Sequence, residues 1–277
     1  MKILSKASLI DSELAKVGSV EVVSPEIASK VMPGQFVVIM VSEKGERVPL
    51  TIVDKDIVKG TIKLIFQEAG LTTKMLGAMK TGDSLYSLVG PLGHPTQIKK
   101  YGKVIIVGGG IGIAEIYPVA KAMKEACNYV TIILGARSKY LLILEDELRK
   151  ASDELYVATD DGSYGRKGFT TDILEELLDK GKYDLIYSVG PIPMMKRSAA
   201  VTKKFNVKTI VSLNAIMVDA TGMCGCCRIT VGGKTYFSCV DGPEFDASLV
   251  DWEELAKRNK IYDDKEKHIC RLDTLQR

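Results

Sequence analysis

Four of the six cysteines of this chain lie in the run DATGMCGCCRITVGGKTYFSC, residues 219–239. Clustered cysteines form disulfides in exported proteins and bind metals or carry redox chemistry in reducing compartments. The first residues of the chain lack the long apolar core of a signal peptide. We therefore expect a cytoplasmic protein in which these cysteines serve metal or redox chemistry.

The spacing of these cysteines favours an iron–sulfur cluster over zinc. Zinc sites usually take two C-x2-C pairs, or one such pair with two histidines. Here Cys224 and Cys227 form one pair, only Cys239 follows nearby, and the two histidines, His94 and His268, are far apart. In the plant-type 2Fe–2S spacing C-x4-C-x2-C…C, these three cysteines take the last three places.

The first place of that spacing falls on Asp219, whose carboxylate is therefore a candidate for the fourth ligand. The alternative fourth ligand is Cys226, which would give an all-sulfur set. The adjacent residues Cys226 and Cys227 would then both have to point at the metals, which a tight loop allows less readily. We favour Asp219, and Cys226 stays open as the alternative.

A glycine-rich run, VGGGIG, is the second stretch that could do chemistry. It follows the apolar segment KVII and opens a segment with helical spacing, which is where a dinucleotide diphosphate binds in an open α/β sheet. The match to G-x-G-x-x-G is incomplete, because Glu115 stands where the third glycine would fall. The candidate nucleotide-binding residues of this run are Gly108, Gly109, Gly110 and Gly112.

Three further loops are expected at the same edge of the sheet. SVGPIPMMKR places Gly190 and Pro191 after a strand, TDDGSYGRKG contributes Asp160, and YVTIILGARSK ends at Arg137. Parallel strands bring such loops together at their carboxyl ends, where ligands bind. In many NAD-binding sites an acidic residue at the end of such a strand binds the ribose hydroxyls and selects NAD(H). The last of these strands ends without one, and Arg137 could contact a 2′-phosphate. The sequence therefore allows NADP(H) as well as NAD(H).

The elements that must position these residues divide the chain into three parts. Residues 1–98 contain short runs rich in Val, Ile and Thr, which predict a small antiparallel barrel or sandwich. Residues 99–216 alternate apolar strands with helical segments, which predicts a parallel sheet covered on both faces. Residues 217–277 form a short segment rich in Gly and Cys that ends in a charged, helix-like tail.

Composition excludes several functional classes. Apolar residues make up 46% of the chain and the net charge is only +3, so no nucleic-acid-binding face is indicated. No apolar run is long enough to span a membrane. We find no Ser-His-Asp set or carboxylate pair, and we predict no catalytic acid–base residue.

With a barrel, a nucleotide-binding domain and an iron–sulfur segment in this order, the chain resembles the ferredoxin reductase-like FAD/NAD-binding electron-transfer subunits. Within that family it looks like the small (alpha) subunit of NADH-dependent reduced ferredoxin:NADP oxidoreductase, also described as a sulfide dehydrogenase subunit. The electron-transfer subunit of dihydroorotate dehydrogenase is a close relative. The motifs that carry the resemblance span the chain: RVPLTI, VGGGIGIA, LGARS, VGPIPMM and MVDATGMCGCCRITVGGKTYFSCVDGPEFD.

The resemblance implies that the barrel binds FAD. The residues expected to line the flavin or bind its diphosphate are Arg47, Pro49, Leu50, Thr51, Gly70, Thr72 and Thr73. Many relatives have the arginine one residue closer to the Ser or Thr, whereas here Val48 intervenes. Relatives commonly have Pro in place of Glu115, so this chain has an acidic side chain near the expected phosphates. They lack a cysteine at position 226, which supports Asp219 as the fourth ligand.

The resemblance also implies a chemistry and a partner. The cofactors would be FAD, a 2Fe–2S cluster and NAD(H), with the flavin between the two-electron carrier and the one-electron carrier. We expect a hetero-oligomer with a larger flavin or iron–sulfur subunit, through which ferredoxin would be reached. Two alternatives remain, an electron-transfer subunit serving dihydroorotate oxidation and a non-catalytic metal-binding redox sensor.

Overall fold

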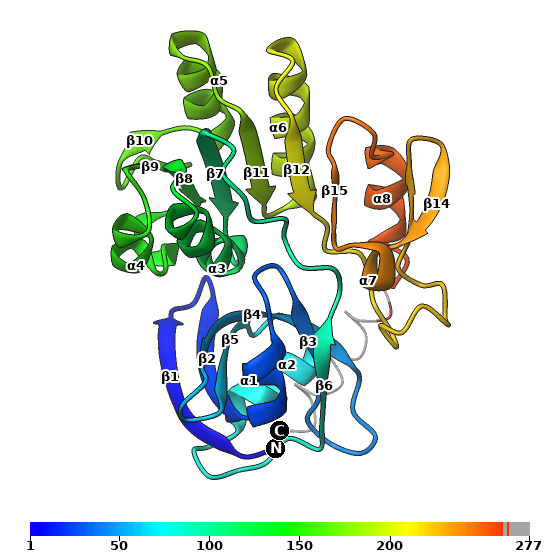
Figure 1. Ribbon diagram of the computed structural model, residues 1–277. Helices are drawn as coiled ribbons and strands as arrows, with labels where there is room; N and C mark the ends of the chain where they lie inside the picture. The colour runs from blue at the N-terminus through cyan, green and yellow to red at the C-terminus, as the bar shows by residue number, and fades with distance from the viewer. Residues whose placement is uncertain (263–264, 266–277) are drawn as a thin grey trace.

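The computed structural model describes residues 1–262 and residue 265. In Figure 1 a β-barrel lies at the bottom, an α/β unit lies above it, and a smaller lobe with the cysteine run lies beside both. Most of the charged, helix-like tail expected at the C-terminus falls outside the described residues; the last helix described is α8 (Trp252–Arg258).

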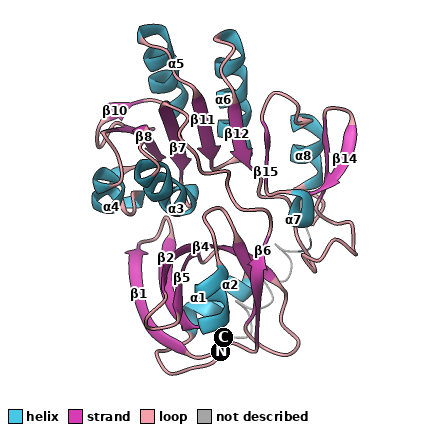
Figure 2. Ribbon diagram, in the orientation of Figure 1, coloured by secondary structure: helices cyan, strands magenta, loops and turns pink. Residues whose placement is uncertain are grey.

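The N-terminal part is an antiparallel sheet with the spatial order β1-β2-β5-β4-β3-β6, and it curls into a barrel (Figure 2). Its strands are β1 (Ile3–Asp11), β2 (Lys16–Val23), β3 (Phe36–Met40), β4 (Val48–Asp56), β5 (Thr61–Gln67) and β6 (Ser87–Leu92). Two short helices, α1 (Pro25–Lys30) and α2 (Leu71–Ala78), interrupt them. The Ile3 N–H donates to the Asp83 carbonyl at 2.8 Å, which joins the first strand to the segment before β6. Of the barrel and sandwich that the sequence left open, the barrel is confirmed.

The second part is a mixed sheet with the order β10-β9-β8-β7-β11-β12-β15, parallel from β10 to β12. The parallel strands are β7 (Lys103–Gly109), β8 (Tyr129–Ala136), β9 (Glu154–Thr159), β10 (Arg166–Lys167), β11 (Leu185–Val189) and β12 (Thr209–Ser212). The helices are α3 (Gly112–Glu125), the 3-10 turn η1 (Lys139–Leu141), α4 (Glu145–Lys150), α5 (Thr170–Lys180) and α6 (Ile192–Lys204).

Alternate residues of the central strand pack on opposite faces of this sheet. Val104 and Ile106 of β7 share a core with α3 and α4, whereas Ile105 and Val107 share a core with α5 and α6. A parallel sheet covered on both faces needs apolar residues at every position, because successive side chains point to opposite sides. The expected α/β layer is therefore confirmed.

The third part contributes a strand that the sequence did not predict. After the hairpin β13 (Arg228–Val231) and β14 (Lys234–Phe237) and the short helix α7 (Ser238–Asp241), strand β15 (Glu244–Asp246) pairs antiparallel with β12. Only three residues long, β15 has no periodicity of its own and is fixed by pairing with a distant strand. It anchors the cysteine lobe to the edge of the α/β sheet.

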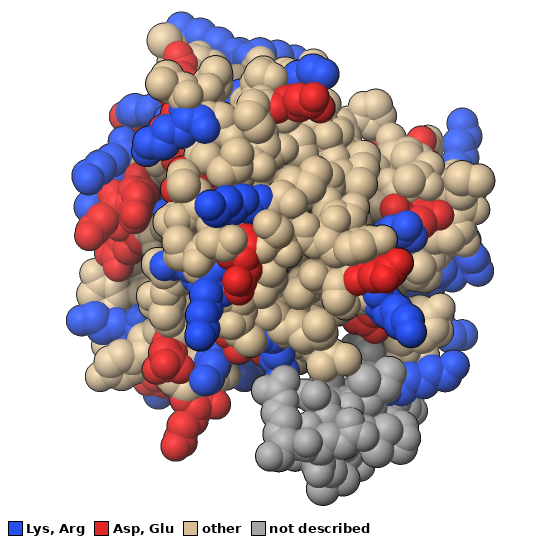
Figure 3. Space-filling model, turned by 90° about the horizontal axis from the view of Figure 1, so that it is seen from below, with Lys and Arg blue, Asp and Glu red and all other residues tan. Residues whose placement is uncertain are grey.

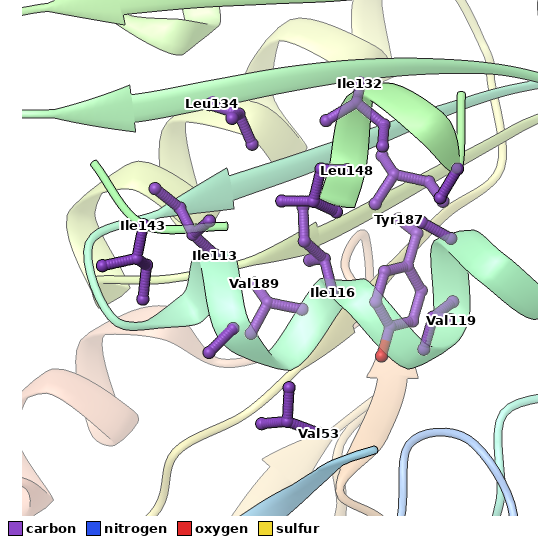
Figure 4. Packing of buried hydrophobic residues seen from close by; sticks show 14 of the residues in the cluster. Val53, Ile113, Ile116, Val119, Ile132, Leu134, Ile143, Leu148, Tyr187 and Val189 are labelled. Atoms are coloured by element: carbon purple, nitrogen blue, oxygen red, sulfur yellow. The ribbon is translucent and has the colours of Figure 1, made fainter. Parts of the chain in front are cut away.

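Helix α3 packs along strand β4, which joins the barrel to the α/β unit. In Figure 4, Val53 of β4 lies beneath the helix that carries Ile113, Ile116 and Val119. Further along the same contact, Lys121 Nζ lies 3.9 Å from Asp54 Oδ1. Thr51 precedes Val53 by two residues, so the pleat directs both side chains to the face that meets α3.

The buried carboxyl of Glu244 connects all three parts of the molecule. Its Oε1 accepts a hydrogen bond from the Tyr187 hydroxyl of β11 at 2.7 Å and another from the Thr96 hydroxyl in the segment after the barrel. Burial raises the pKa of Glu244, and the two hydroxyl donors oppose that shift. The lobe, the parallel sheet and the connecting segment therefore meet at one polar contact.

The surface seen from below in Figure 3 carries basic and acidic side chains interspersed, with no continuous patch of either sign. Among the described residues, no helix is long and apolar enough to cross a membrane.

Candidate functional site

The glycine-rich run forms the turn between β7 and α3, as predicted. Gly110 has a φ of +57° and its N–H donates to the Gly135 carbonyl at 2.9 Å, which ties the turn to the end of β8. A Cβ on Gly112 would lie 2.6 Å from the Val189 carbonyl oxygen. The lack of side chains here leaves the first turn of α3 open to a ligand.

Gly108 has a different role from the other glycines of the run. It lies within β7, where a Cβ would come within 2.6 Å of the Ile116 side chain and 3.2 Å of the Ile113 backbone. Its absence of a side chain therefore allows α3 to pack closely on the strand. Gly108 does not line the cavity described next.

A cavity of about 740 Å³ opens at the carboxyl edge of the parallel sheet, on the side that faces the barrel. Seven of the predicted nucleotide-binding residues line it, and they come from four different loops: Gly109, Gly110, Gly112, Arg137, Asp160, Gly190 and Pro191. The loops also contact each other, because the Asp160 N–H donates to the Ala136 carbonyl at 3.1 Å. Barrel residues including Val17 and Gln67 close the opposite side.

Several residues of this cavity were not predicted from the sequence. Phe169, Thr170 and Thr171 at the start of α5 and Arg197 of α6 line it too. The segment GFTTD carried a helix-start signal, because an Asp follows three residues after the residue that precedes the helix. Nothing in the sequence indicated that this helix start would face the glycine-rich turn.

Glu115, in the first turn of α3, lines the same cavity. Burial raises the pKa of its carboxyl, and a hydrogen bond with Thr51 acts in the opposite direction. Helix α3 packs against β4, the barrel strand that carries Thr51. A group whose protonation is favoured by burial repels nearby phosphates less than a fully ionised carboxylate would.

The residues predicted to bind FAD lie on two neighbouring barrel segments. Pro49, Leu50 and Thr51 belong to β4, and Arg47 is exposed just before it. Gly70 is the N-cap of α2, and the Thr72 hydroxyl donates to Glu46 Oε2 at 3.0 Å. That bond holds the start of α2 beside the start of β4, so the two segments form one face.

The Thr73 side chain caps helix α2. Its hydroxyl oxygen accepts the N–H groups of Ala69 and Gly70, each at 3.0 Å. Gly70 is the N-cap, so Thr72 and Thr73 are the second and third residues of the helix. The N–H groups of the first turn of α2 remain available to an anion.

In the cysteine run, the Asp219 carboxylate organises its own loop. Oδ1 accepts the N–H of Thr221 at 2.9 Å and Oδ2 accepts the N–H of Cys224 at 3.0 Å. The hydrogen bond from Thr221 is the main reason why the pKa of Asp219 lies below its ordinary value. Asp219 therefore presents an anionic carboxylate on the loop that carries the exposed Cys224.

Two other predicted ligands, Cys227 and Cys239, are already in contact. Their Sγ atoms lie 3.2 Å apart and both residues are buried. Burial, and then the neighbouring Cys227 thiol, raise the pKa of Cys239 to about 12. These two thiols share a core with Phe36 of the barrel, so an iron atom held here would lie close to the flavin domain.

The four predicted ligands are not gathered around one point. Within residues 1–262, no group of three or more His, Cys, Asp or Glu side chains stands in metal-binding geometry. The donor set nevertheless fits an iron–sulfur cluster, since it offers a buried thiol pair and a loop with a third thiol and a carboxylate. Cys226 is less buried than that pair; its carbonyl accepts a hydrogen bond from Arg258 at 2.9 Å, and together with Cys224 it lines a pocket beside α8.

Two family models match segments of the chain. Residues 214–251 match the model of the iron–sulfur cluster binding domain of dihydroorotate dehydrogenase B, and residues 106–200 match the oxidoreductase NAD-binding domain. Both matches fall on the segments where the structure places the cysteine lobe and the glycine-rich cavity.

Several whole-length relatives were also found. The dihydroorotate dehydrogenase B (NAD(+)) electron transfer subunit homolog of Thermotoga maritima is 50% identical over 88% of this chain and 86% of its own. A probable subunit of the same type from Methanopyrus kandleri is 35% identical, over 80% and 81%. A chain in the solved structure of NADH-dependent reduced ferredoxin-NADP oxidoreductase is 45% identical, with a TM-score of 0.91 over 96% of this chain and 95% of that one.

Proposed function

The chain belongs to the family of dihydroorotate dehydrogenase B electron transfer subunits and their homologues, and on that premise we propose how it works. It is an oxidoreductase subunit with FAD, a 2Fe–2S cluster and NAD(H) as cofactors. We propose that it moves electrons between NAD(H) and a larger flavin or iron–sulfur subunit, as in NADH-dependent reduced ferredoxin:NADP oxidoreductase. Ferredoxin would exchange electrons through that partner.

The observation that carries this proposal is the position of the 740 Å³ cavity between the glycine-rich turn and the barrel. Gly110, Gly112 and Gly190 would hold the dinucleotide, and Thr51 with the start of α2 would hold FAD. A flavin accepts a hydride and releases single electrons, so it suits a place between nicotinamide and an iron–sulfur cluster. The protein groups position the reacting rings and supply no acid or base.

The shared core between Phe36 and the buried cysteines supports electron transfer from the barrel to the lobe. At the outer side of the lobe, the side chains of Val218, Met223 and Val240 are exposed around the cysteine run. An apolar rim around a redox centre suits a larger protein subunit. A cytoplasmic location is part of the proposal, because clustered cysteines that bind a metal cluster suit a reducing compartment.

We further propose a division at residues 98/99 and 216/217 into an FAD domain, an NAD(P) domain and a cluster segment. For the nicotinamide cofactor we propose NADH. Arg137 is the candidate for a 2′-phosphate contact, but Asp160 lies on the adjoining loop and would repel that phosphate. A much lower dissociation constant for NADPH than for NADH would contradict this preference.

The experiment that tests the function is an anaerobic titration of the purified chain after iron–sulfur reconstitution. We expect flavin absorption bands with iron–sulfur shoulders, and bleaching of the flavin by NADH in the absence of any partner. Electron paramagnetic resonance should then detect a reduced 2Fe–2S cluster. A protein that stays colourless after reconstitution with FAD, iron and sulfide would contradict the proposal and favour a redox sensor.

Dihydroorotate oxidation is the second candidate, favoured by the 50% identity to the Thermotoga maritima homologue. The aspartate in the first ligand place favours ferredoxin:NADP chemistry, since an all-cysteine set would favour the dihydroorotate system. Co-purification with the native partner distinguishes the two. A complex that reduces NAD+ with dihydroorotate belongs to the second type, and one that couples NADH, NADPH and ferredoxin belongs to the first.

A further inference from the structure

Phe169 and Arg197 line the large cavity, and Asp172 joins them through hydrogen bonds. Arg197 Nη2 donates to Asp172 Oδ1 at 2.9 Å, and the other oxygen of Asp172 accepts the Phe169 N–H at 3.0 Å. The Arg197 guanidinium carbon lies 5.1 Å from the centre of the Phe169 ring. Asp172 thus fixes the arginine above the ring, and we call these three residues the arginine clip.

The clip contributes little to folding by itself. The Arg197 and Asp172 side chains are 54% and 30% exposed, and ion pairs of this kind stabilise a protein by about 0–1 kcal/mol. Phe169 remains 53% exposed, although it stands at the N-cap of α5, where a small polar residue is usual. A large aromatic ring and a fixed cation left open to a cavity suggest a ligand.

The clip is next to free hydrogen-bond donors. Asp172 occupies the Phe169 N–H, but the helix offers no partner to the N–H groups of Thr170 and Thr171 in its first turn. Thr171 is only 1% exposed, its hydroxyl has no hydrogen-bond partner, and the residue lines the cavity. An unpartnered buried hydroxyl beside a helix N-terminus and a guanidinium is a set of donors suited to a phosphate.

The distribution of charged side chains around the cavity suggests that the arginine clip binds an anion. Arg137 and Asp160 lie together on the adjoining loops at the ends of β8 and β9, and Glu115 lines the cavity from the first turn of α3. Arg197 is the other cation among the lining residues, and it approaches from the α5–α6 side, opposite the first turn of α3. A dinucleotide diphosphate carries two negative charges, and a planar guanidinium matches its oxygens in a bidentate contact.

We propose that Arg197, fixed by Asp172 above Phe169, binds the diphosphate of the pyridine dinucleotide together with the N-terminus of α5. This inference rests on the proposed function, in which the dinucleotide occupies this cavity. The glycine-rich turn contacts the diphosphate from one side, and the arginine clip contacts it from the other. Arg197 is a binding residue and takes no part in hydride transfer.

The test measures dissociation constants of NADH and ADP-ribose for the FAD- and cluster-loaded full chain, by anaerobic calorimetry at several salt concentrations. The flavin and the cluster are reduced with dithionite beforehand, so that bound NADH cannot transfer a hydride. Arg197→Ala should weaken both ligands by the same factor, about tenfold or more, because a charge-assisted hydrogen bond is lost. Its affinity should also depend less steeply on salt than that of the wild type. Arg197→Lys should keep most of the salt dependence and lose part of the affinity, since it keeps the charge without the planar fork.

A matched control comes from the same pair of helices. Lys204 of α6 pairs with Glu175 of α5 at 2.7 Å, away from the cavity. Lys204→Ala removes an equivalent ion pair and should leave both dissociation constants unchanged. Retained FAD content and cluster absorption show that each variant is folded. If Arg197→Ala does not fold, Arg197→Gln serves as the second variant.

Three results would overturn the inference while leaving the proposed function intact. These are an unchanged NADH affinity in Arg197→Ala, a loss for NADH but none for ADP-ribose, or a loss with the salt dependence unaltered. The second would place the contact on the nicotinamide half, and the third would show that no charge is involved. If the wild-type protein binds neither ligand, the proposed function and this inference both fail.

Discussion

At the scale of single residues, the fourth ligand of the cluster is the sharpest question. Asp219 accepts N–H groups from Thr221 and Cys224, so its carboxylate faces the loop that carries the first cysteine ligand. Cys226 lies one residue from Cys227, and it borders the pocket beside α8 together with Cys224. The choice between Asp219 and Cys226, drawn from spacing, stays a prediction.

Asp219→Ala should make the cluster labile, because it removes one ligand and releases two loop N–H groups. Cys226→Ala should leave iron content and spectrum essentially unchanged. Cys224→Ala, Cys227→Ala or Cys239→Ala should abolish assembly. Iron and sulfide analysis of anaerobically reconstituted protein measures all of these variants. If Asp219→Ala keeps its iron while Cys226→Ala loses it, the cysteine is the ligand.

Asp219→Cys should restore the plant-type ligand set and still assemble a cluster. A carboxylate is a harder ligand than a thiolate, so the exchange alters the charge and covalency at one iron. We expect a shifted midpoint potential and altered g values in electron paramagnetic resonance. Cys226→Ala provides the control, with the wild-type potential. An unchanged potential in Asp219→Cys would mean that residue 219 does not touch the cluster.

The sequence showed which residues have unusual backbone or chemical properties, such as the glycines of the turn. It did not show which residues lie next to each other in space. The glycines within residues 108–112 indicated a tight turn between a strand and a helix, and such a turn joins β7 to α3. That this turn binds a phosphate stays a prediction. Arg197 carried no such signal, since a lysine- and arginine-rich helix face is ordinary. Its relation to Phe169 arises only when α5 and α6 pack side by side, with their starts at the same edge of the sheet.

At the scale of elements, strand β4 joins two functions. Its Thr51 is predicted to contact FAD, while Val53 packs into the core beneath α3. The strand therefore links the flavin domain to the first turn of the nucleotide-binding helix. A small shift of α3 would move the nucleotide relative to the flavin.

The double variant Thr51→Val, Arg47→Ala should lose FAD on gel filtration, because it removes a hydroxyl donor and a cation from the predicted flavin face. Flavin absorbance of the eluted protein measures the loss. Val58→Ala is the control, since Val58 is 98% exposed in the turn after β4 and should retain FAD. Full retention by the double variant would mean that the flavin strand has been misassigned.

Elements with strong periodicity were predictable, and elements fixed by distant contacts were not. The apolar runs of β7, β8 and β11 predicted a buried parallel sheet because both faces are covered. Strand β15 has the sequence EFD, which is too short to show a periodic pattern. Its extended conformation is stabilised by antiparallel pairing with β12 at the sheet edge. The barrel strands were clear as a group, although their spatial order depends on long-range pairing.

At the scale of the whole molecule, one apolar core and one polar contact each join all three parts, in addition to the packing of α3 on β4. The apolar core contains Phe36 with Cys227 and Cys239. The polar contact is Glu244, which accepts the hydroxyls of Tyr187 and Thr96. Burial raises the pKa of Tyr187 well above its ordinary value, so this hydroxyl remains a donor at neutral pH.

The sign of the pH effect at Glu244 follows from its raised pKa. The carboxyl holds its proton more tightly in the folded protein than in the unfolded chain, whose ordinary pKa is 4.5. Its contribution to stability is therefore fully present below about pH 4.5 and declines as the pH rises toward the folded pKa. Above that range the folded protein holds a buried carboxylate that relies on two hydroxyl donors.

Glu244→Gln should remove this decline, because the amide keeps an oxygen acceptor for Tyr187 and Thr96 and never ionises. We expect the melting temperature of the loaded protein to exceed that of the wild type by a few degrees at pH 7–8, and the difference to vanish near pH 4.5. Tyr187→Phe should enlarge the wild-type decline, since it removes one donor that favours the ionised carboxyl. In the double variant Glu244→Gln, Tyr187→Phe, the melting temperature should depend less on pH than it does in Tyr187→Phe alone. Calorimetric scans across this pH range provide the measurement, and parallel curves for wild type and Glu244→Gln would show that the carboxyl does not titrate at the junction of the three parts.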